Sequence, residues 1–196
     1  MTISTGVFIL ALLGLSVVAF FGGRVSISGL TINTGGLQAY LLKAQKARAM
    51  QASLPLKDVA AEVRRKTRSL PHVLPLAKIL WVDDSPLNNQ AERLAFANVG
   101  IFTDSYTNNT DALSALRLEQ YDVVISDIGR GESTETGWDL AGAVRSANPS
   151  IPFFLYTYGS SESDKVRARQ LGLNGVIELP SALMVDVVNS IRETNR

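Results

Sequence analysis

Three aspartates and one threonine stand directly after apolar runs that read as strands. Asp83 and Asp84 follow "ILWV", Asp127 follows "VVIS", and Thr157 follows "FFLY". Carboxylates crowded together repel one another, and a hard divalent cation with oxygen ligands, usually Mg²⁺, relieves that repulsion. A bound Mg²⁺ ion leaves positions open for phosphoryl oxygens, and a carboxylate beside it can serve as a nucleophile toward phosphate. The residue types therefore predict a Mg²⁺ site at the three aspartates, with the Thr157 hydroxyl placed to hydrogen-bond an acquired phosphoryl group.

The elements that must position these residues begin near residue 78, where strand-like and helix-like segments start to alternate. Strands are expected at 79–82, 101–106, 121–126, 153–156 and 175–177, with a helix after each. This alternation favours a parallel sheet covered on both faces. Five strands and five helices in this span have the size and order of a flavodoxin-like, doubly wound α/β sheet. Ligands of such sheets bind outside the carboxyl ends of the strands, so all four side chains should meet at that edge.

The first expected helix covers residues 86–98, immediately after the acidic pair. Ser85 is a suitable N-cap, and Pro86 suits the first helical position. The face predicted to be buried carries Leu87, Ala91, Leu94 and Ala95, which recur at helical spacing.

The front of the chain is unusually apolar. Hydrophobic residues make up 46% of the sequence and charged residues only 19%, and residues 6–23 carry no charge. A helix of this length nearly spans a hydrocarbon core of roughly 30 Å. Basic residues follow it, so the positive-inside rule places residues 1–5 outside and the rest in the cytoplasm. The sequence therefore predicts a single-pass cell-membrane protein with a transmembrane helix at 6–23; a cleaved signal peptide and a buried core helix are the alternatives.

Residues 24–77 are predicted to form a basic juxtamembrane helical linker. From Arg24 to Lys78 there are ten Lys or Arg residues and two acids, whereas the remainder has nine basic and sixteen acidic residues. Residues 37–52 look helical. This segment could adsorb to anionic lipid, serve as a solvated linker, or pair with a second copy in a homodimer. Nucleic acid is not expected as a partner, because the domain from residue 78 is acidic.

The chain has no cysteine and one histidine. These counts exclude disulfides, thiolate metal sites and cysteine nucleophiles, and they argue against a multi-histidine metal site. The three oxygen-rich strand ends therefore remain the strongest chemical feature.

Taken together, "VDDS", "VVISDI" and "FFLYT" resemble the receiver domain of two-component response regulators, the CheY-like superfamily, over residues 78–196. The resemblance implies that Asp127 is the phospho-acceptor and Thr157 the switch hydroxyl. It implies Mg²⁺ held by Asp83, Asp84 and Asp127, a histidine kinase or another signalling protein as partner, and a signalling role rather than an enzymatic one.

Two positions depart from the family pattern. Leu179 stands before Pro180 where receivers carry a lysine that contacts the acidic site, and Val176 replaces the aromatic residue that couples to the switch hydroxyl. The loop after Asp127 is also longer than usual, and Arg130 within it could supply a compensating contact to the phosphate.

Three functions follow as hypotheses. The first is a membrane-anchored, response-regulator-like protein with Mg²⁺-dependent phosphoryl acceptance at Asp127 and output through protein contacts. The second is a degenerate receiver that serves as a phosphorylation-independent docking module. The third, a haloacid-dehalogenase-like phosphatase, is disfavoured because such enzymes need a second acid two residues after the nucleophile, where this chain has Ser85 or Pro86.

Overall fold

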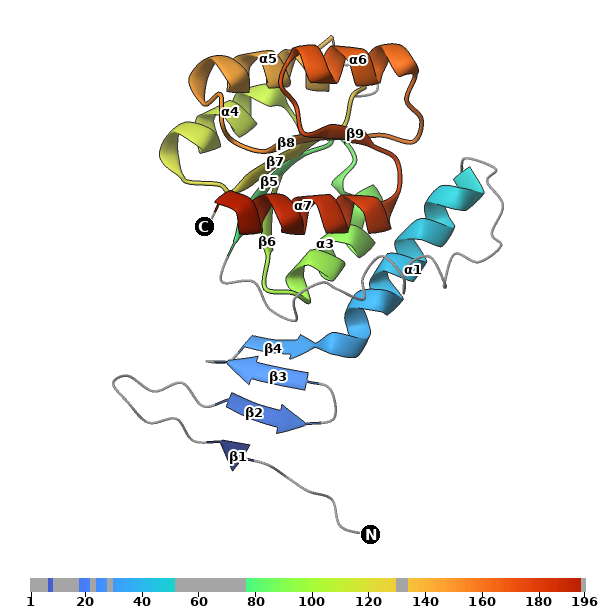
Figure 1. Cartoon of the computed structure of the whole chain (residues 1–196), viewed down its shortest axis with the longest axis vertical. Helices are drawn as coiled ribbons and strands as arrows, with labels where there is room; N and C mark the ends of the chain where they lie inside the picture. Colours follow the sequence, from blue (N-terminus) through green and yellow to red (C-terminus); the bar gives the residue numbers. More distant parts are fainter. Residues whose placement is uncertain are drawn as a thin grey trace.

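The computed structural model describes residues 7–8, 18–21, 24–27, 30–51, 77–129 and 134–194. From residue 78 the chain forms a five-stranded sheet with helices on both faces (Figure 1). The strands are β5 (Lys78–Val82), β6 (Phe102–Tyr106), β7 (Val123–Ser126), β8 (Phe153–Tyr156) and β9 (Gly175–Ile177). The predicted α/β fold with a five-stranded parallel sheet is confirmed.

The strand order is β6-β5-β7-β8-β9, and every neighbouring pair is parallel. The chain first builds outward from β5 to β6 and then returns to place β7 on the other side of β5. The order therefore reverses between β5 and β7, which is the position where doubly wound sheets bind their ligands.

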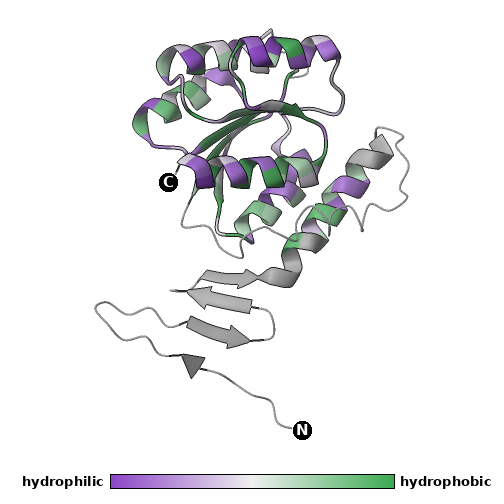
Figure 2. Ribbon diagram, in the orientation of Figure 1, coloured by the Kyte–Doolittle hydropathy of each residue, from purple (hydrophilic) through white to green (hydrophobic). Residues whose placement is uncertain are grey.

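Helices cover both faces of this sheet. They are the 3₁₀ turn η1 (Pro86–Asn89) and the helices α3 (Gln90–Ala97), α4 (Asn109–Leu118), α5 (Gly137–Ala147), α6 (Glu162–Gln170) and α7 (Pro180–Thr194). Helices α4, α5 and α6 lie on one face, and α3 and α7 lie on the other (Figure 1). The central strands between them are coloured largely as hydrophobic in Figure 2, whereas the helices alternate between hydrophobic and hydrophilic residues.

The core consists of two apolar layers separated by the sheet. One layer joins residues of β5, β7 and β8 to α3 and α7, and the other joins the alternate residues of these strands to α4, α5 and α6. Strands β7 and β8 are buried at every position. Burial on both faces explains why these strands appear in the sequence as mostly apolar runs instead of alternating ones.

Helix α1 (Thr34–Gln51) adds a further element to the layer of α3 and α7. The helix predicted at 37–52 is confirmed, and it lies beside α3 (Figure 1). Leu37, Leu41 and Ala44 are buried within the same apolar cluster as α3 and α7. This part of the predicted linker therefore packs directly against the receiver-like domain.

Four short strands precede α1 and form an antiparallel sheet in the order β1-β2-β3-β4. They are β1 (Val7–Phe8), β2 (Val18–Phe21), β3 (Arg24–Ile27) and β4 (Leu30–Asn33). The helix predicted over residues 6–23 is wrong at the residues of β1 and β2. Their valines and phenylalanines favour strands, and β2 pairs along its whole length with β3. Within the described residues, no helix has the length and apolarity needed to cross a membrane.

The helix predicted at 86–98 is present, and Ala95 is buried as predicted, but the leucines of the predicted face are exposed. Leu87 is 81% exposed and Leu94 is 40% exposed, whereas Asn89, Glu92 and Ala95 are buried. The Ser85 side chain makes no capping hydrogen bond. The first turn is 3₁₀, which advances about 120° per residue instead of about 100°, so it rotates Leu87 away from the α-helical face.

Candidate functional site

Asp83 and Asp84 occupy the carboxyl end of β5, as their position after the strand predicts. The backbone N–H of Asp83 donates to the Tyr106 carbonyl at 2.9 Å, which extends the pairing of β5 with β6 by one residue. The Asp83 side chain is buried, and Asp84 is exposed. The two neighbouring acids therefore occupy different environments, one inside the turn that follows β5 and one in solvent.

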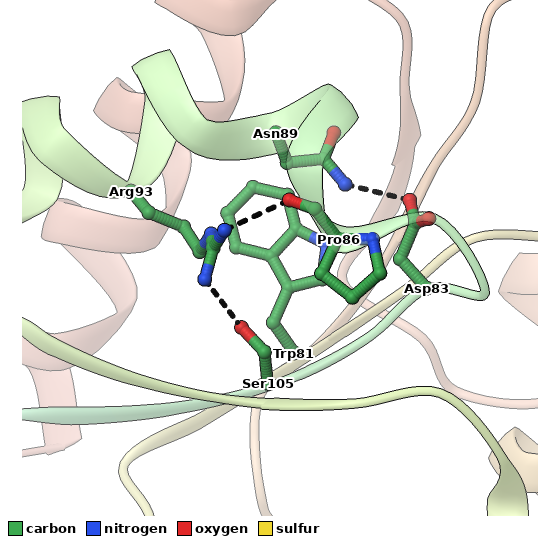
Figure 3. Close-up of a pocket in the computed structure, with 6 residues that line it drawn as sticks. All are labelled: Trp81, Asp83, Pro86, Asn89, Arg93 and Ser105. Carbon is green, nitrogen blue, oxygen red and sulfur yellow. Dashed lines mark hydrogen bonds between the residues drawn. The ribbon is translucent and has the colours of Figure 1, made fainter.

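The Asp83 carboxylate is held by two N–H donors. The Ser85 backbone N–H donates to Oδ1 at 2.7 Å, and Asn89 Nδ2 donates to Oδ2 at 2.6 Å (Figure 3). Asn89 is 3% exposed. Both oxygens of Asp83 thus accept hydrogen bonds from the turn between β5 and α3.

Asp127 lies beside Val82 at the neighbouring strand end. Its backbone N–H donates to the Val82 carbonyl at 3.0 Å, and its own Oδ1 accepts from the Ile128 backbone N–H at 2.7 Å. The Ser126 hydroxyl donates to the Asp127 carbonyl at 2.8 Å. The backbone of Asp127 is therefore fixed by contacts on both sides of the strand end.

Gly137 sets the path of the loop after Asp127. Its N–H donates to the Ile128 carbonyl at 2.9 Å. A Cβ atom at this position would lie 2.1 Å from the Asp127 carbonyl oxygen and 2.9 Å from Ser126 Oγ. Only glycine allows the start of α5 to approach the Asp127 backbone this closely.

Thr157 follows β8 on the far side of β7. Its backbone N–H donates to the Ile177 carbonyl at 3.1 Å. Since β5, β7 and β8 are adjacent parallel strands, their carboxyl ends lie side by side at one edge of the sheet. The structure thus brings Asp83, Asp127 and Thr157 to the same edge, which we call the acidic edge.

The acidic edge offers the oxygen donors that Mg²⁺ prefers. However, no three acidic, histidine or cysteine side chains of the described residues are arranged to hold a metal ion. Both carboxylate oxygens of Asp83, one of the three predicted ligands, already accept hydrogen bonds, from the Ser85 N–H and from Asn89 Nδ2. Asp83, Asp84 and Asp127 are therefore not arranged as a three-ligand Mg²⁺ site, although their oxygen chemistry suits Mg²⁺.

Leu179 and Val176 lie where the sequence places them relative to the last strand. The Leu179 carbonyl accepts from the N–H groups of Ala182 and Leu183, so this residue marks the start of α7. Val176 lies in β9 and pairs with Leu155 of β8. Arg130, predicted as a phosphate contact, lies outside the described residues.

A buried pair next to Thr157 was not predicted. Tyr156 Oη donates to Glu92 Oε1 at 2.8 Å, and Glu92 is 3% exposed. The ring of Tyr156 packs edge-on against Trp81, with centroids 5.7 Å apart. The pair links α3 to β8, the strand that Thr157 follows.

Sequence reasoning also missed Asn89 and Arg93. Arg93 Nη2 donates to the Pro86 carbonyl at 2.8 Å, and Nη1 donates to Ser105 Oγ at 2.9 Å (Figure 3). The predicted buried face of the helix at 86–98 does not include the polar residues at positions 89, 92 and 93. The burial of Asn89 and Glu92 follows from the 3₁₀ turn, which the apolar pattern does not reveal.

The comparison with protein families agrees with this geometry. The model of the response regulator receiver domain matches residues 79–186, which is more than half of the chain. The chain therefore belongs to the response regulator receiver domain family.

Two curated relatives come from Escherichia coli. The chain is 25% identical over 107 residues to the sensor protein EvgS of strain K12 and 26% identical over 105 residues to the transcriptional regulatory protein PcoR. These matches cover 55% and 54% of this chain, but only 9% and 46% of the two relatives. The chain thus spans less than half the length of either protein.

Solved structures show the same fold. The signal receiver domain of a signal transduction histidine kinase from Syntrophus aciditrophicus is 26% identical, with a TM-score of 0.54, and the match covers 61% of this chain and 93% of that one. A two-component response regulator from Clostridium difficile is 24% identical, with a TM-score of 0.55 and coverage of 61% and 99%.

Proposed function

We propose that this chain is a two-component signalling protein whose receiver domain acts through protein contacts and does not depend on phosphorylation of Asp127. The single observation that carries the proposal is the arrangement of Asp83, whose two carboxylate oxygens each accept a short hydrogen bond, one from the Ser85 N–H and one from Asn89 Nδ2. Leu179, at the position of the family's lysine, supports it, because a leucine side chain offers no charge to a phosphoryl group.

The surface beside the acidic edge suits contact with another protein. Leu87 is 81% exposed and Tyr158 is 41% exposed, and the two line one hollow of about 190 Å³ with Asn88 and residues of α1 and α3. Exposed apolar side chains rimmed by polar ones are typical of protein-binding surfaces. A histidine kinase or another signalling protein is the class of partner that the family membership favours, and the chain itself is proposed to turn over no substrate.

Phosphoryl acceptance at Asp127 is the second candidate function. It is favoured by the common edge formed by β5, β7 and β8, where Asp83, Asp127 and Thr157 directly follow their strands. In this alternative Mg²⁺ would offset the charge of the carboxylates at this edge, and the Thr157 hydroxyl would hydrogen-bond the acquired group.

One experiment separates the two candidates. The full chain and an Asp127→Asn variant are incubated with MgCl₂ and acetyl phosphate, and their intact masses are measured. We expect no phosphoryl adduct on either protein. An adduct on the parent chain that the variant lacks would refute the phosphorylation-independent proposal and establish the second candidate.

A complementation experiment in cells tests whether signalling needs the Asp127 carboxylate. In a strain that lacks the gene, the Asp127→Ala variant should restore the parent phenotype as well as the parent chain does. Loss of complementation by a variant that is folded and present at parental levels would show that signalling needs the Asp127 carboxylate.

Attachment to the cell membrane through residues 6–23, with the receiver domain in the cytoplasm, is also proposed from the sequence. Its support is the uncharged segment followed by basic residues. The full chain should stay with membranes after alkaline carbonate extraction, whereas a chain that begins at residue 34 should be released. Release of both would refute attachment through this segment.

A further inference from the structure

The turn that holds the Asp83 carboxylate is closed by several contacts. Asn89 Nδ2 donates to Asp83 Oδ2 at 2.6 Å, and this bond is buried. The Ser85 N–H donates to Oδ1 at 2.7 Å, and the Asn88 N–H donates to the Ser85 carbonyl at 2.9 Å. The carboxylate therefore points toward the start of α3, as Figure 3 shows.

Arg93 fixes this turn from the next turn of α3. Its guanidinium donates to the Pro86 carbonyl at 2.8 Å and to Ser105 Oγ of β6 at 2.9 Å. Since Pro86 lies between Ser85 and Asn89, the arginine holds the segment that carries both donors to Asp83. Trp81 lies behind the turn and lines the same small pocket (Figure 3).

These contacts explain why the Asp83 carboxylate is not oriented as a ligand of a Mg²⁺ ion at the acidic edge. A cation that binds the Asp83 carboxylate has to replace the Asn89 amide or share an oxygen with it. A hydrogen bond to a charged acceptor is stronger than one between neutral groups, and it opposes that replacement.

We propose that Asn89 is a positioning residue that holds the Asp83 carboxylate against α3 and thereby weakens cation binding at the acidic edge. The inference rests on the proposed phosphorylation-independent function and deepens it, because it names the side chain that keeps one predicted ligand from the cation. Asn89 touches neither a metal ion nor a phosphoryl group in this role, and it acts through Asp83.

The test compares Mg²⁺ affinity between variants of the full chain. Asn89→Ala removes the amide donor, and Asn89→Leu removes it with similar side-chain volume. Asn88→Ala is the matched control, since Asn88 is the adjacent residue of the same type and is exposed. Binding of MgCl₂ is measured by titration calorimetry and by the fluorescence of the buried Trp81 beside the turn.

We expect Asn89→Ala and Asn89→Leu to bind Mg²⁺ about tenfold more tightly than the parent, and Asn88→Ala to match the parent. A gain in affinity is a result that mere loss of structure does not produce. Unchanged or weaker binding in whichever Asn89 variant keeps the parent circular dichroism spectrum would overturn the inference, because Asn89 would then be neutral or would help the cation.

The outcome is distinct from that of the acetyl phosphate experiment. If the parent chain is phosphorylated, the proposed function fails, while the ratio of Mg²⁺ affinities still decides the role of Asn89. If the parent is not phosphorylated and the Asn89 variants bind no more Mg²⁺, the proposed function stands and the positioning role of Asn89 fails.

Discussion

The domain has two groups of acidic side chains, near opposite ends of β5, and they are held by different kinds of donor. Near the amino end, Lys78 Nζ lies 2.8 Å from Asp104 Oδ2 and also pairs with Glu119, while Tyr121 Oη donates to Asp104 at 2.8 Å. At the carboxyl end, the partners of Asp83 are the neutral N–H donors of a backbone amide and an asparagine.

The difference is electrostatic. Hydrogen bonds to Asp104 and Glu119 raise the pKa of Lys78 above its usual range. Partial burial acts to raise the pKa of Asp104, but the hydrogen bonds from Lys78 and Tyr121 outweigh it and bring that pKa below its ordinary value. A lysine cancels charge, whereas N–H donors fix the direction of a carboxylate and leave its charge in place. The acidic edge thus combines a fixed geometry with negative charge.

The largest loss of stability is expected for a change at Gly137. The acidic edge depends on a close backbone contact at this glycine, whereas the ion pairs of Lys78 with Asp104 and Glu119 need no such contact. Gly137→Ala would place Cβ 2.1 Å from the Asp127 carbonyl oxygen. Backbone atoms cannot move aside cheaply, so the free energy of unfolding should fall by about 3 kcal/mol. Urea denaturation of the full chain measures this loss.

Gly142→Ala is the control for that variant. Gly142 also lies in α5, and a Cβ there would have no atom within 4 Å. Alanine favours the helix over glycine, so this variant should gain up to about 1 kcal/mol. Equal behaviour of the two alanine variants would show that the approach of Gly137 to Asp127 does not constrain the edge.

The sheet and its acidic edge could be predicted because their signals are local and strong. Runs such as "VVIS" and "FFLY" are buried on both faces and are therefore mostly apolar, and each run is followed at once by Asp127 or Thr157. Parallel strand order then places these residues at one edge.

The contacts that decide the chemistry of the edge could not be predicted in the same way. Asn89 and Glu92 are buried because a 3₁₀ turn precedes α3, and nothing in the apolar spacing distinguishes this turn from an α-helical one. The apolar segment 6–23 shows a related ambiguity, since an uncharged run fits both a helix and strands such as β2. Pairing with β3, the next strand along the chain, decides between them.

An intermediate loss of stability is expected when Tyr156 is changed. Its partner Glu92 is a further buried acid with a neutral donor, so this variant tests how much such donors contribute. Glu92 is 3% exposed, and the Tyr156 hydroxyl donates to it. Tyr156→Phe keeps the ring against Trp81 but leaves a buried carboxylate with one donor fewer. The free energy of unfolding should fall by about 2 kcal/mol, as measured by urea denaturation.

Tyr158→Phe serves as the comparison for this variant, because Tyr158 is 41% exposed and two positions away. Because the Tyr158 side chain is partly exposed, water can replace contacts that its hydroxyl loses, and Tyr158→Phe should change stability by less than about 0.5 kcal/mol. A loss at Tyr156 no larger than at Tyr158 would mean that neutral donors contribute little to holding buried acids in this domain.

The smallest change in stability is expected for Lys78→Met, and it should be seen only when the pH is lowered. The folded-state pKa of Asp104 lies below its ordinary value, so its contribution to stability is present above about pH 4 and is lost as the pH falls through the folded pKa. Lys78→Met removes the donor and charge that lower this pKa, while burial of Asp104 continues to raise it. The variant should therefore lose less stability than the parent between about pH 6 and pH 3, measured as the urea midpoint at each pH.

Lys46→Met, at an exposed position on α1, should keep the parent pH profile. If Lys78→Met also kept that profile, the lysine would not set the charge balance of the amino-end group, and the contrast with the N–H donors of Asp83 would lose its electrostatic basis.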